Sequence, residues 1–474
     1  MDWNELLSPL REVTNKAFNP NDIRTEFRKD YHRIIGSASF RRLQDKAQVY
    51  PLQRGDFVRT RLTHSLEASS YAGSLGDTVF QKLIDSGTPG VNDLVRENCS
   101  DILECAGLIH DIGNPPFGHF GEFAIRQWFE ENLPRLKFCG KPVEELLNEQ
   151  MRADFLNFEG NAQALRVLTR LHFLMYPGKG MNLTFALLNT IIKYPVSSTQ
   201  IDKKSGDIRT KKMGYFYSEQ ELFENVTEST GARGYRYPLT FLLEAADDLA
   251  YKTADIEDAA AKGYINFGII LEELRSEKYR SMCETEAEAE VLERETASLE
   301  KSLNTAKSFN LSDPKAEAVR RWLVKAQSGL VYAASDAFCE NYDAIMEGGL
   351  KTELFENSPS RVLMKALGEI AFNYAFRSND VVMSELAESA AMKFLLDKIV
   401  SSALRFDTED EQMYDRDLVQ LLSENYLDIC RRSCEGKPLA EQCYYRLLFA
   451  TDCIGGMTDS YASDFYRKLL GVDV

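Results

Sequence analysis

Three of the five histidines in this chain stand beside residues that could bind a metal ion or move a proton. His64 comes shortly after two arginines, and His110 ends an apolar run and is followed directly by Asp111. His119 lies three residues before Glu122, in the string GNPPFGHFGE. Imidazole nitrogen and carboxylate oxygen together suit Mn, Fe, Co, Ni or Zn better than calcium. A single histidine is more often a hydrogen-bonded core residue, so the chemical interpretation depends on the set and not on one member.

A second candidate set lies on a predicted alanine-rich helix, Thr240–Ala261. Asp247, Tyr251 and Asp255 recur every four residues, so they share one face of this helix. Carboxylates among apolar side chains need a partner or a metal ion. An exposed acidic stripe is the alternative interpretation, and Asp248 could replace Asp247 as a ligand.

Positive charge gathers where a phosphorylated ligand would need it. Residues 24–61 hold ten Lys or Arg against four Asp or Glu, in a chain whose formal charge is −17. Arg59 and Arg61 stand beside His64, which favours phosphate binding by both, whereas Arg54 is consistent with an ordinary surface position. A second basic group could bind phosphate or form a solvated turn; it comprises Lys203, Lys204, Arg209, Lys211 and Lys212.

The composition is that of a folded globular protein, with 44% apolar and 27% charged residues. Its acidity disfavours general binding to nucleic acid or to anionic membranes. Of nine cysteines only Cys430 and Cys434 are close in sequence, and their spacing is not C-x-x-C, so reduced thiols are expected. There is no signal-peptide pattern at the N-terminus and no apolar run of membrane-spanning length, which predicts a cytoplasmic protein without a membrane partner.

Apolar residues recur at three- and four-residue spacing along most of the chain, which predicts an all-α protein, a large helical bundle around the metal site. The clearest helical segments are Ile102–Ile109, Asn161–Leu171, Thr240–Ala261 and Ser360–Phe376. A short two-stranded β-ribbon could form near residues 200–217. The Glu- and Ala-rich stretch Cys283–Lys301 predicts a solvated helix or a mobile surface segment. This stretch separates an N-terminal part, which contains most of the motifs, from a C-terminal part that we expect to have only a structural role.

Longer strings carry a more specific signal. The chain contains, in this order, SxxFRRLQDKAQVYPL (Ser37–Leu52), RTRLTHSLE (Arg59–Glu67), HDIGNPPFGHFGE (His110–Glu122), NFEGNAQALR (Asn157–Arg166), LEAADDLAY (Leu243–Tyr251) and GGMTDSYASDFYRKL (Gly455–Leu469). Together they resemble the deoxyguanosine triphosphate triphosphohydrolase (dGTPase) family of the HD-domain phosphohydrolase superfamily. The resemblance runs from about residue 24 to the C-terminus and is weakest between about residues 265 and 450. It implies an HD-type catalytic region over residues 1–265 and a helical region over 266–474 that packs on it and on neighbouring subunits.

The resemblance also implies an activity: hydrolysis of dGTP, or of several dNTPs, to the deoxynucleoside and inorganic tripolyphosphate, which would control the dNTP pool. The cofactor would be a divalent metal ion, Mg or Mn foremost, with Fe, Co, Ni and Zn as alternatives. The implied metal ligands are His64, His110, Asp111 and Asp247. The implied catalytic pair is His119 and Glu122, and the implied substrate-binding residues are Gln48, Arg61, Lys193, Tyr251 and Asp255.

In this assignment Arg61 lies near the α-phosphate and Lys193 grips the triphosphate. Gln48 and Asp255 lie near the 3′-hydroxyl, with Tyr251 under the sugar. The family further implies a homo-oligomer, commonly a hexamer, and single-stranded DNA or a nucleotide as an effector.

Two alternatives stay open from sequence. One is a broad-range dNTP triphosphohydrolase activated by a nucleotide effector, and the other is a non-hydrolysing HD protein that binds nucleotides or single-stranded DNA. A cyclic-dinucleotide or alarmone phosphodiesterase is disfavoured because the strings outside the metal site match the triphosphohydrolases. His32 and His172 have no motif around them and are predicted to be structural or surface residues.

Overall fold

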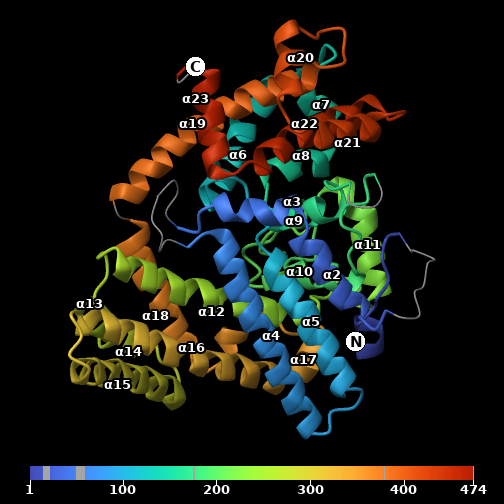
Figure 1. Ribbon diagram of the computed structural model, residues 1–474. Coiled ribbons are helices and arrows are strands. Elements are labelled where there is room, and N and C mark those ends of the chain that lie inside the picture. The colour runs from blue at the N-terminus through green and yellow to red at the C-terminus, as the bar shows by residue number, and fades with distance from the viewer. Residues whose placement is uncertain (14–21, 50–58, 174–176, 378, 473–474) are drawn as a thin grey trace.

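The computed structural model describes residues 1–13, 22–49, 59–173, 177–377 and 379–472 (Figure 1). Arg54 therefore lies outside the described residues. The predicted all-α class is confirmed, since helices dominate and the described residues contain a single two-stranded sheet. In that sheet β1 (Lys137–Phe138) pairs antiparallel with β2 (Lys141–Pro142).

The ribbon that was expected near residues 200–217 is wrong in its location. This segment forms turns and two short 3-10 helices, η3 (Ile208–Thr210) and η4 (Tyr217–Glu219). Its backbone groups find local partners: Asp202 N–H donates to the Thr210 carbonyl at 2.9 Å, and Asp207 caps η3 by accepting from Arg209 N–H. The Ile208 N–H donates to Lys351 of a distant loop at 2.9 Å. Because these backbone donors and acceptors are already hydrogen-bonded, the segment does not need the hydrogen bonds of a partner strand.

Three long helices form the framework of the site. The helix α4 (Arg61–Asp85) packs along α5 (Asp93–Ile109), and α12 (Pro238–Ala261) packs against both. The α4–α5 contact is close because Gly107 carries no side chain: a Cβ at this position would lie 2.4 Å from the Cα of Ser69. The contact brings the start of α4 next to the end of α5, where His64 and His110 lie.

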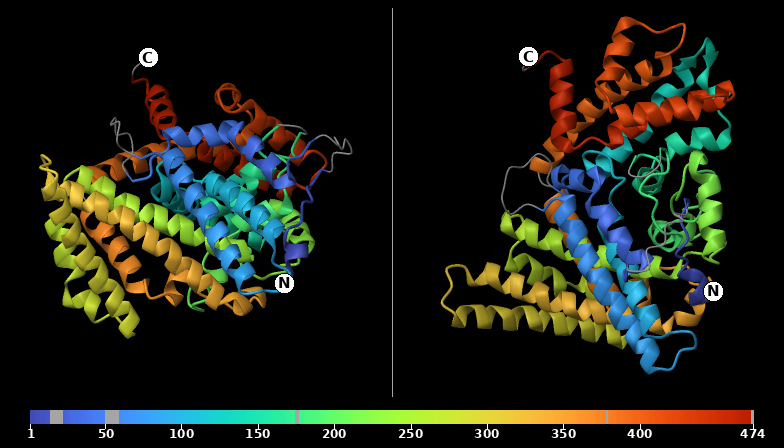
Figure 2. Two further views of the ribbon diagram at one scale, coloured as in Figure 1. Left: turned by 60° about the horizontal axis from the view of Figure 1, so that its bottom comes forward. Right: turned by 45° about the vertical axis from the view of Figure 1, so that its right-hand side comes forward.

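A second group of helices packs at the upper end of the molecule in Figure 1. It contains α6 (Gly118–Asn132), α7 (Val143–Leu146), α8 (Glu149–Leu156), α19 (Asn379–Arg405), α20 (Met413–Gln420), α21 (Glu424–Cys434), α22 (Leu439–Gly455) and α23 (Asp459–Leu469). The helices α15 (Glu286–Ser308) and α16 (Pro314–Glu340) form a hairpin at the opposite end (Figure 2). The Glu- and Ala-rich stretch is thus largely a helix, begun by a capping box between Thr285 and Glu288.

The remaining helices connect these groups. They are α1 (Trp3–Leu6), α2 (Glu26–Ile35), α3 (Ala38–Arg42), η1 (Leu43–Asp45), η2 (Leu133–Arg135), α9 (Gly160–Thr169), α10 (Phe185–Ile191), α11 (Gln220–Ser229), α13 (Phe267–Leu274), α14 (Glu277–Arg280), α17 (Tyr342–Met346), η5 (Leu354–Asn357), α18 (Arg361–Ala371) and a π-helical turn (Phe372–Phe376). Among the described helices, not one has the length and apolar composition that crossing a bilayer requires.

Candidate metal centre and phosphate site

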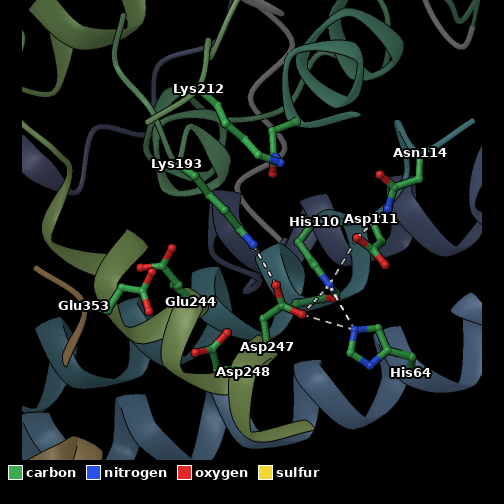
Figure 3. A network of polar contacts seen from close by, with 12 residues as sticks. His64, His110, Asp111, Asn114, Lys193, Lys212, Glu244, Asp247, Asp248 and Glu353 are labelled. Atoms are coloured by element: carbon green, nitrogen blue, oxygen red, sulfur yellow. Dashed lines mark hydrogen bonds and ion pairs between the residues drawn. The ribbon is translucent and has the colours of Figure 1, made fainter. Parts of the chain in front are cut away.

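His64, His110 and Asp247 come from three different parts of the chain, and their side chains point toward one another (Figure 3). The Nε2 atoms of His64 and His110 lie 3.3 Å apart, and Asp247 Oδ1 lies 3.2 Å from each of them. His64 is in the first turn of α4, where a capping box between Thr60 and Thr63 fixes the start of the helix. Asp247, on α12, closes the group from the other side.

Asp111 joins the group because α5 ends before it. Adjacent side chains diverge on a helix, but the helix ends at Ile109 and His110 is its C-cap. Ligand atoms of His64, His110 and Asp111 therefore all lie within 4.8 Å of one another. Asn114 donates from Nδ2 to Asp111 Oδ1 at 2.7 Å and holds that carboxylate in place.

The donor set fits a divalent metal ion. Ligands at about 2.0–2.2 Å from one ion, at right angles to each other, are separated by about 3 Å, close to the observed spacing of His64, His110 and Asp247. The Nδ1–H of His110 donates to the Gly107 carbonyl at 2.8 Å, which leaves the lone pair of the neutral ring on Nε2, facing the cluster. These residues could hold a metal ion, as the sequence led us to expect.

Opposite charges within the cluster shift the pKa values of its members. Burial disfavours the charged form of His110, but Asp247 and Asp111 outweigh it and raise the pKa of His110. Burial would raise the pKa of Asp247, but Lys193 and His110 hold it well below its ordinary value. In the same way Arg61 and the histidines lower the pKa of Asp111 against its burial. Both carboxylates are therefore ionised at neutral pH, as metal ligands must be.

Two buried cations contact the predicted ligand carboxylates directly. Arg61 Nη1 lies 2.5 Å from Asp111 Oδ2, and Lys193 Nζ lies 2.6 Å from Asp247 Oδ2. The Nε of Arg61 is buried and has no hydrogen-bond partner among the described residues. The structure thus brings these predicted phosphate-binding residues together with the predicted metal ligands.

His119 and Glu122 lie one turn apart on α6. Glu122 is buried and fixed, since its Oε1 accepts from the Gly160 N–H at 2.9 Å. Its Oε2 lies 3.4 Å from Nδ1 of His119, whose side chain is 84% exposed. Burial opposes the ionisation of Glu122, but His119 outweighs it and lowers the pKa of this carboxyl. The arrangement can orient one imidazole nitrogen and leave the other free.

The predicted sugar-binding residues include buried polar groups. Asp255 is buried on the same face of α12 as Asp247 and Tyr251, and burial with the nearby Asp258 raises its pKa to about 8. Burial likewise raises the pKa of Tyr251. The Oε1 of Gln48 is buried without a hydrogen-bond partner among the described residues. Their roles stay predictions.

Arg59 does not have the role that its position suggested. Its guanidinium lies 3.0 Å from Glu67, 2.5 Å from Glu257 and 2.5 Å from Asp258, so three carboxylates already neutralise it. The sequence could not reveal this, because two of the three acids lie on α12, about two hundred residues away. Arg59 joins α4 to α12 and is not free for phosphate.

Asp248 lies away from both histidines and pairs with Lys252 at 2.8 Å (Figure 3). It is therefore Asp247, and not Asp248, that contacts the cluster. Of the basic group at 200–217, Lys212 lies nearest the site and pairs with Glu159 at 2.8 Å. His172, which we expected to be structural, contacts the Ser39 hydroxyl at 2.9 Å, and burial lowers its pKa to about 4.

Sequence reasoning missed the residues that support the site from behind. The buried Lys46 donates from Nζ to the Gly455 carbonyl at 2.8 Å and to the Asn114 carbonyl at 2.5 Å. Asp459 accepts from the Phe117 N–H at 2.9 Å and from the Ala47 N–H at 2.8 Å. Both side chains occur in the strings that carry the resemblance, and that was the only signal available.

Arg166 is a third support. It forms a two-pronged ion pair with Asp452 of α22, the closest contact being 2.7 Å, and a second pair with Glu219 at 2.9 Å. All three side chains are buried. The pair with Asp452 fastens α9, whose first residue donates to Glu122, to α22, and the pair with Glu219 fastens it to η4.

Comparison with known proteins shows the family to which the chain belongs. Residues 61–208 match the HD domain model, a range that includes His64, His110 and Asp111. A deoxyguanosinetriphosphate triphosphohydrolase-like protein of Listeria monocytogenes is 41% identical over 100% of both chains. A protein of the same description from Synechocystis sp. is 34% identical over 100% of both chains. A deoxyguanosinetriphosphate triphosphohydrolase of Enterobacter sp. is 32% identical over 94% of each chain. The chain therefore belongs to the deoxyguanosinetriphosphate triphosphohydrolase family of HD-domain phosphohydrolases.

Proposed function

We propose that this protein is a metal-dependent enzyme that hydrolyses dGTP to deoxyguanosine and inorganic tripolyphosphate, and so controls the dNTP pool. One observation carries the proposal: Arg61 and Lys193 each contact a carboxylate of the candidate metal centre, at 2.5 Å and 2.6 Å. Positive charge next to a metal centre is what binding and neutralising a polyphosphate needs. The names of the related proteins support the choice of dGTP.

We assign the metal ligands as His64, His110, Asp111 and Asp247, with Mg or Mn as the ion and Fe, Co, Ni or Zn as alternatives. A divalent ion bound there supplies Lewis-acid polarisation of a phosphoryl oxygen and of water. The two carboxylates suit Mg and Mn, and the two imidazoles suit Fe, Ni and Zn.

The chain's own residues then bind and orient the substrate. Arg61 donates to the α-phosphate and Lys193 neutralises the rest of the triphosphate. Glu122 accepts the Nδ1–H of His119, which leaves Nε2 free to exchange a proton at the reacting phosphate. The orphaned Oε1 of Gln48 and the carboxyl of Asp255 are the groups we assign to the 3′-hydroxyl.

Tyr251 would support the deoxyribose from below. It follows Asp247 by one turn of α12, so a nucleotide whose phosphates reach the metal centre could extend its sugar along this face. We therefore expect Tyr251→Ala to raise KM more than it lowers kcat.

Product identification tests the proposal. Purified protein is incubated with dGTP and Mg or Mn, beside the other three dNTPs, and products are separated by ion exchange and read by phosphorus NMR. Tripolyphosphate with deoxyguanosine is the expected result. Release of dGMP with pyrophosphate would overturn it, and similar rates on all four dNTPs would favour the broad-range alternative. Tight binding without any turnover would favour the non-hydrolysing alternative.

A further inference from the structure

Two cysteines that the proposed function does not use lie close together at the end of α21. Cys430 and Cys434 are one helical turn apart, so they share one face of the helix, and both line the same hollow. Both sulfurs also face α22: Cys430 Sγ lies 3.6 Å from the Tyr445 carbonyl oxygen and Cys434 Sγ lies 3.7 Å from that of Gln442. The pair is therefore oriented by the neighbouring helix.

Positive charge next to the pair favours a thiolate. Arg446 of α22 borders the same hollow, donates from Nη1 to the carbonyls of Ala403 and Phe406, and has no carboxylate partner in the described part of the chain. The neighbouring Cys430 thiol and the charge of Arg446 lower the pKa of Cys434 against its burial. A cysteine near a cation and another thiol is the more reactive member of a redox pair.

Reagents can reach the pair. Both cysteines line an open hollow of about 580 Å³, which has room for a small peptide-like molecule. Cys434 is half-buried whereas Cys430 is buried, so the former is the accessible sulfur.

Joining the two cysteines requires the end of α21 to open, because Cβ atoms four residues apart on a helix lie about 5–6 Å from each other and a disulfide needs about 3.5–4.5 Å. Residues four apart on a helix have Cα atoms about 6 Å apart, inside the range that a disulfide bridges. Closure needs the side chains to approach further, and the backbone can yield because Cys434 is the last residue of α21. The chain leaves the helix at Glu435 in an extended conformation and turns at Gly436, whose φ is 68°.

We propose that Cys430 and Cys434 form a reactive dithiol that is oxidised by low-molecular-weight disulfides to an intrahelical disulfide. The Cys434 thiolate attacks one sulfur of the reagent, forms a mixed disulfide and releases one thiolate, which takes up the proton of Cys430. The Cys430 sulfur then attacks Cys434, forms the protein disulfide and releases the second thiolate, which takes a proton from water in place of the one that Cys434 lost when it ionised. Two protein thiols are oxidised by two electrons, and the reagent disulfide is reduced to two thiols.

Glutathione disulfide and peptide mapping test this reaction. Trypsin cuts after Arg431 and Arg432, so the disulfide links two peptides, Asp417–Arg431 and Ser433–Arg446, that are separate in the reduced protein. Treatment of the full chain, followed by alkylation and digestion without reductant, should give the linked pair. The second peptide also contains Cys443, so the map is repeated with Cys443→Ser, where the link should persist.

Single substitutions distinguish the cysteine that attacks the reagent, Cys434, from the cysteine that closes the protein disulfide, Cys430. Cys430→Ser should stop the reaction at a mixed disulfide on Cys434, whereas Cys434→Ser should give neither the link nor a mixed disulfide at Cys430. The exposed Cys139, on another segment, reports that the reagent has reacted. Full modification of Cys139 with no linked peptide in the unaltered protein would overturn the proposal. If Cys430 in the Cys434→Ser variant forms a mixed disulfide as readily as Cys434 does in the Cys430→Ser variant, the proposal that Cys434 attacks first is wrong.

Discussion

Replacing Glu122 by glutamine should slow hydrolysis about 10- to 30-fold. The substitution keeps the size of the side chain and an oxygen that can accept from the Gly160 N–H, but it removes the charge beside His119. A hydrogen bond to a charged group contributes about 1.5–3 kcal/mol. The Nδ1 to Oε2 distance of 3.4 Å is long, so we take the lower end, about 1.5–2 kcal/mol. At about 1.4 kcal/mol for each factor of ten, this gives the stated loss in kcat.

The double variant decides whether Glu122 acts through His119. His119→Ala alone should lower kcat by about 10²- to 10⁴-fold, the usual contribution of a general acid or base. If Glu122 only orients His119, adding Glu122→Gln to that variant should cost less than about threefold more, because the coupling is then complete. Release of tripolyphosphate under saturating dGTP is the assay.

A matched control is Glu131→Gln, an exposed glutamate on the same helix. It should leave kcat unchanged. The reasoning is refuted if Glu122→Gln slows the His119→Ala enzyme by the same factor as the unaltered enzyme, or if His119→Ala alone stays within about threefold of the parent rate.

Three further changes test other parts of the structure. His64→Ala should abolish turnover and the bound divalent ion together, as measured by elemental analysis after dialysis; a variant that retains one full equivalent of metal would contradict the ligand assignment. Arg59→Met should lower the free energy of unfolding by about 3 kcal/mol in urea, because it leaves the buried carboxylate of Asp258 without its cation, while kcat for dGTP should change less than threefold. Burial raises the pKa of Asp154 to about 6, so its contribution to stability is fully present below the ordinary value of 3.8 and is lost as the pH rises through 6. Asp154→Asn should therefore show a weaker fall in the urea midpoint between pH 4 and pH 7 than the parent, and equal slopes would contradict the assigned pKa.

Local sequence patterns predicted the helices α5, α9, α12 and α18, because a large core requires an apolar stripe on each helix that packs against it. The face shared by Asp247, Tyr251 and Asp255 follows from helical periodicity alone, and α12 has that periodicity. The two-stranded ribbon was predicted at the wrong residues because the strands that do form have no detectable sequence pattern. Strands of two residues are too short to have an alternating pattern, and the hairpin at Lys137–Pro142 gave no period-two signal.

The ion pairs of the site depend on contacts that no local pattern contains. The residues around Arg59 show this most clearly, since two of its partners, Glu257 and Asp258, belong to a helix that meets α4 only in the folded chain. Lys46 and Gly455 are 409 positions apart. Residue types could suggest that positive charge lies near a phosphate site. They could not show which arginine is already paired with carboxylates of the protein.

The contacts of Lys46 and Asp459 have a consequence for biosynthesis. The loop between Asp111 and His119 depends on residues far along the chain: Asp459 accepts from Phe117 of the loop, and Lys46 donates both to Asn114 of the loop and to Gly455. A growing polypeptide can thus form α4, α5 and α12 on the ribosome while the residues that hold this loop, Gly455 and Asp459, have not yet been synthesised. Under the proposed function, nascent chains stalled before α23 should not hydrolyse dGTP, whereas chains that include α23 should.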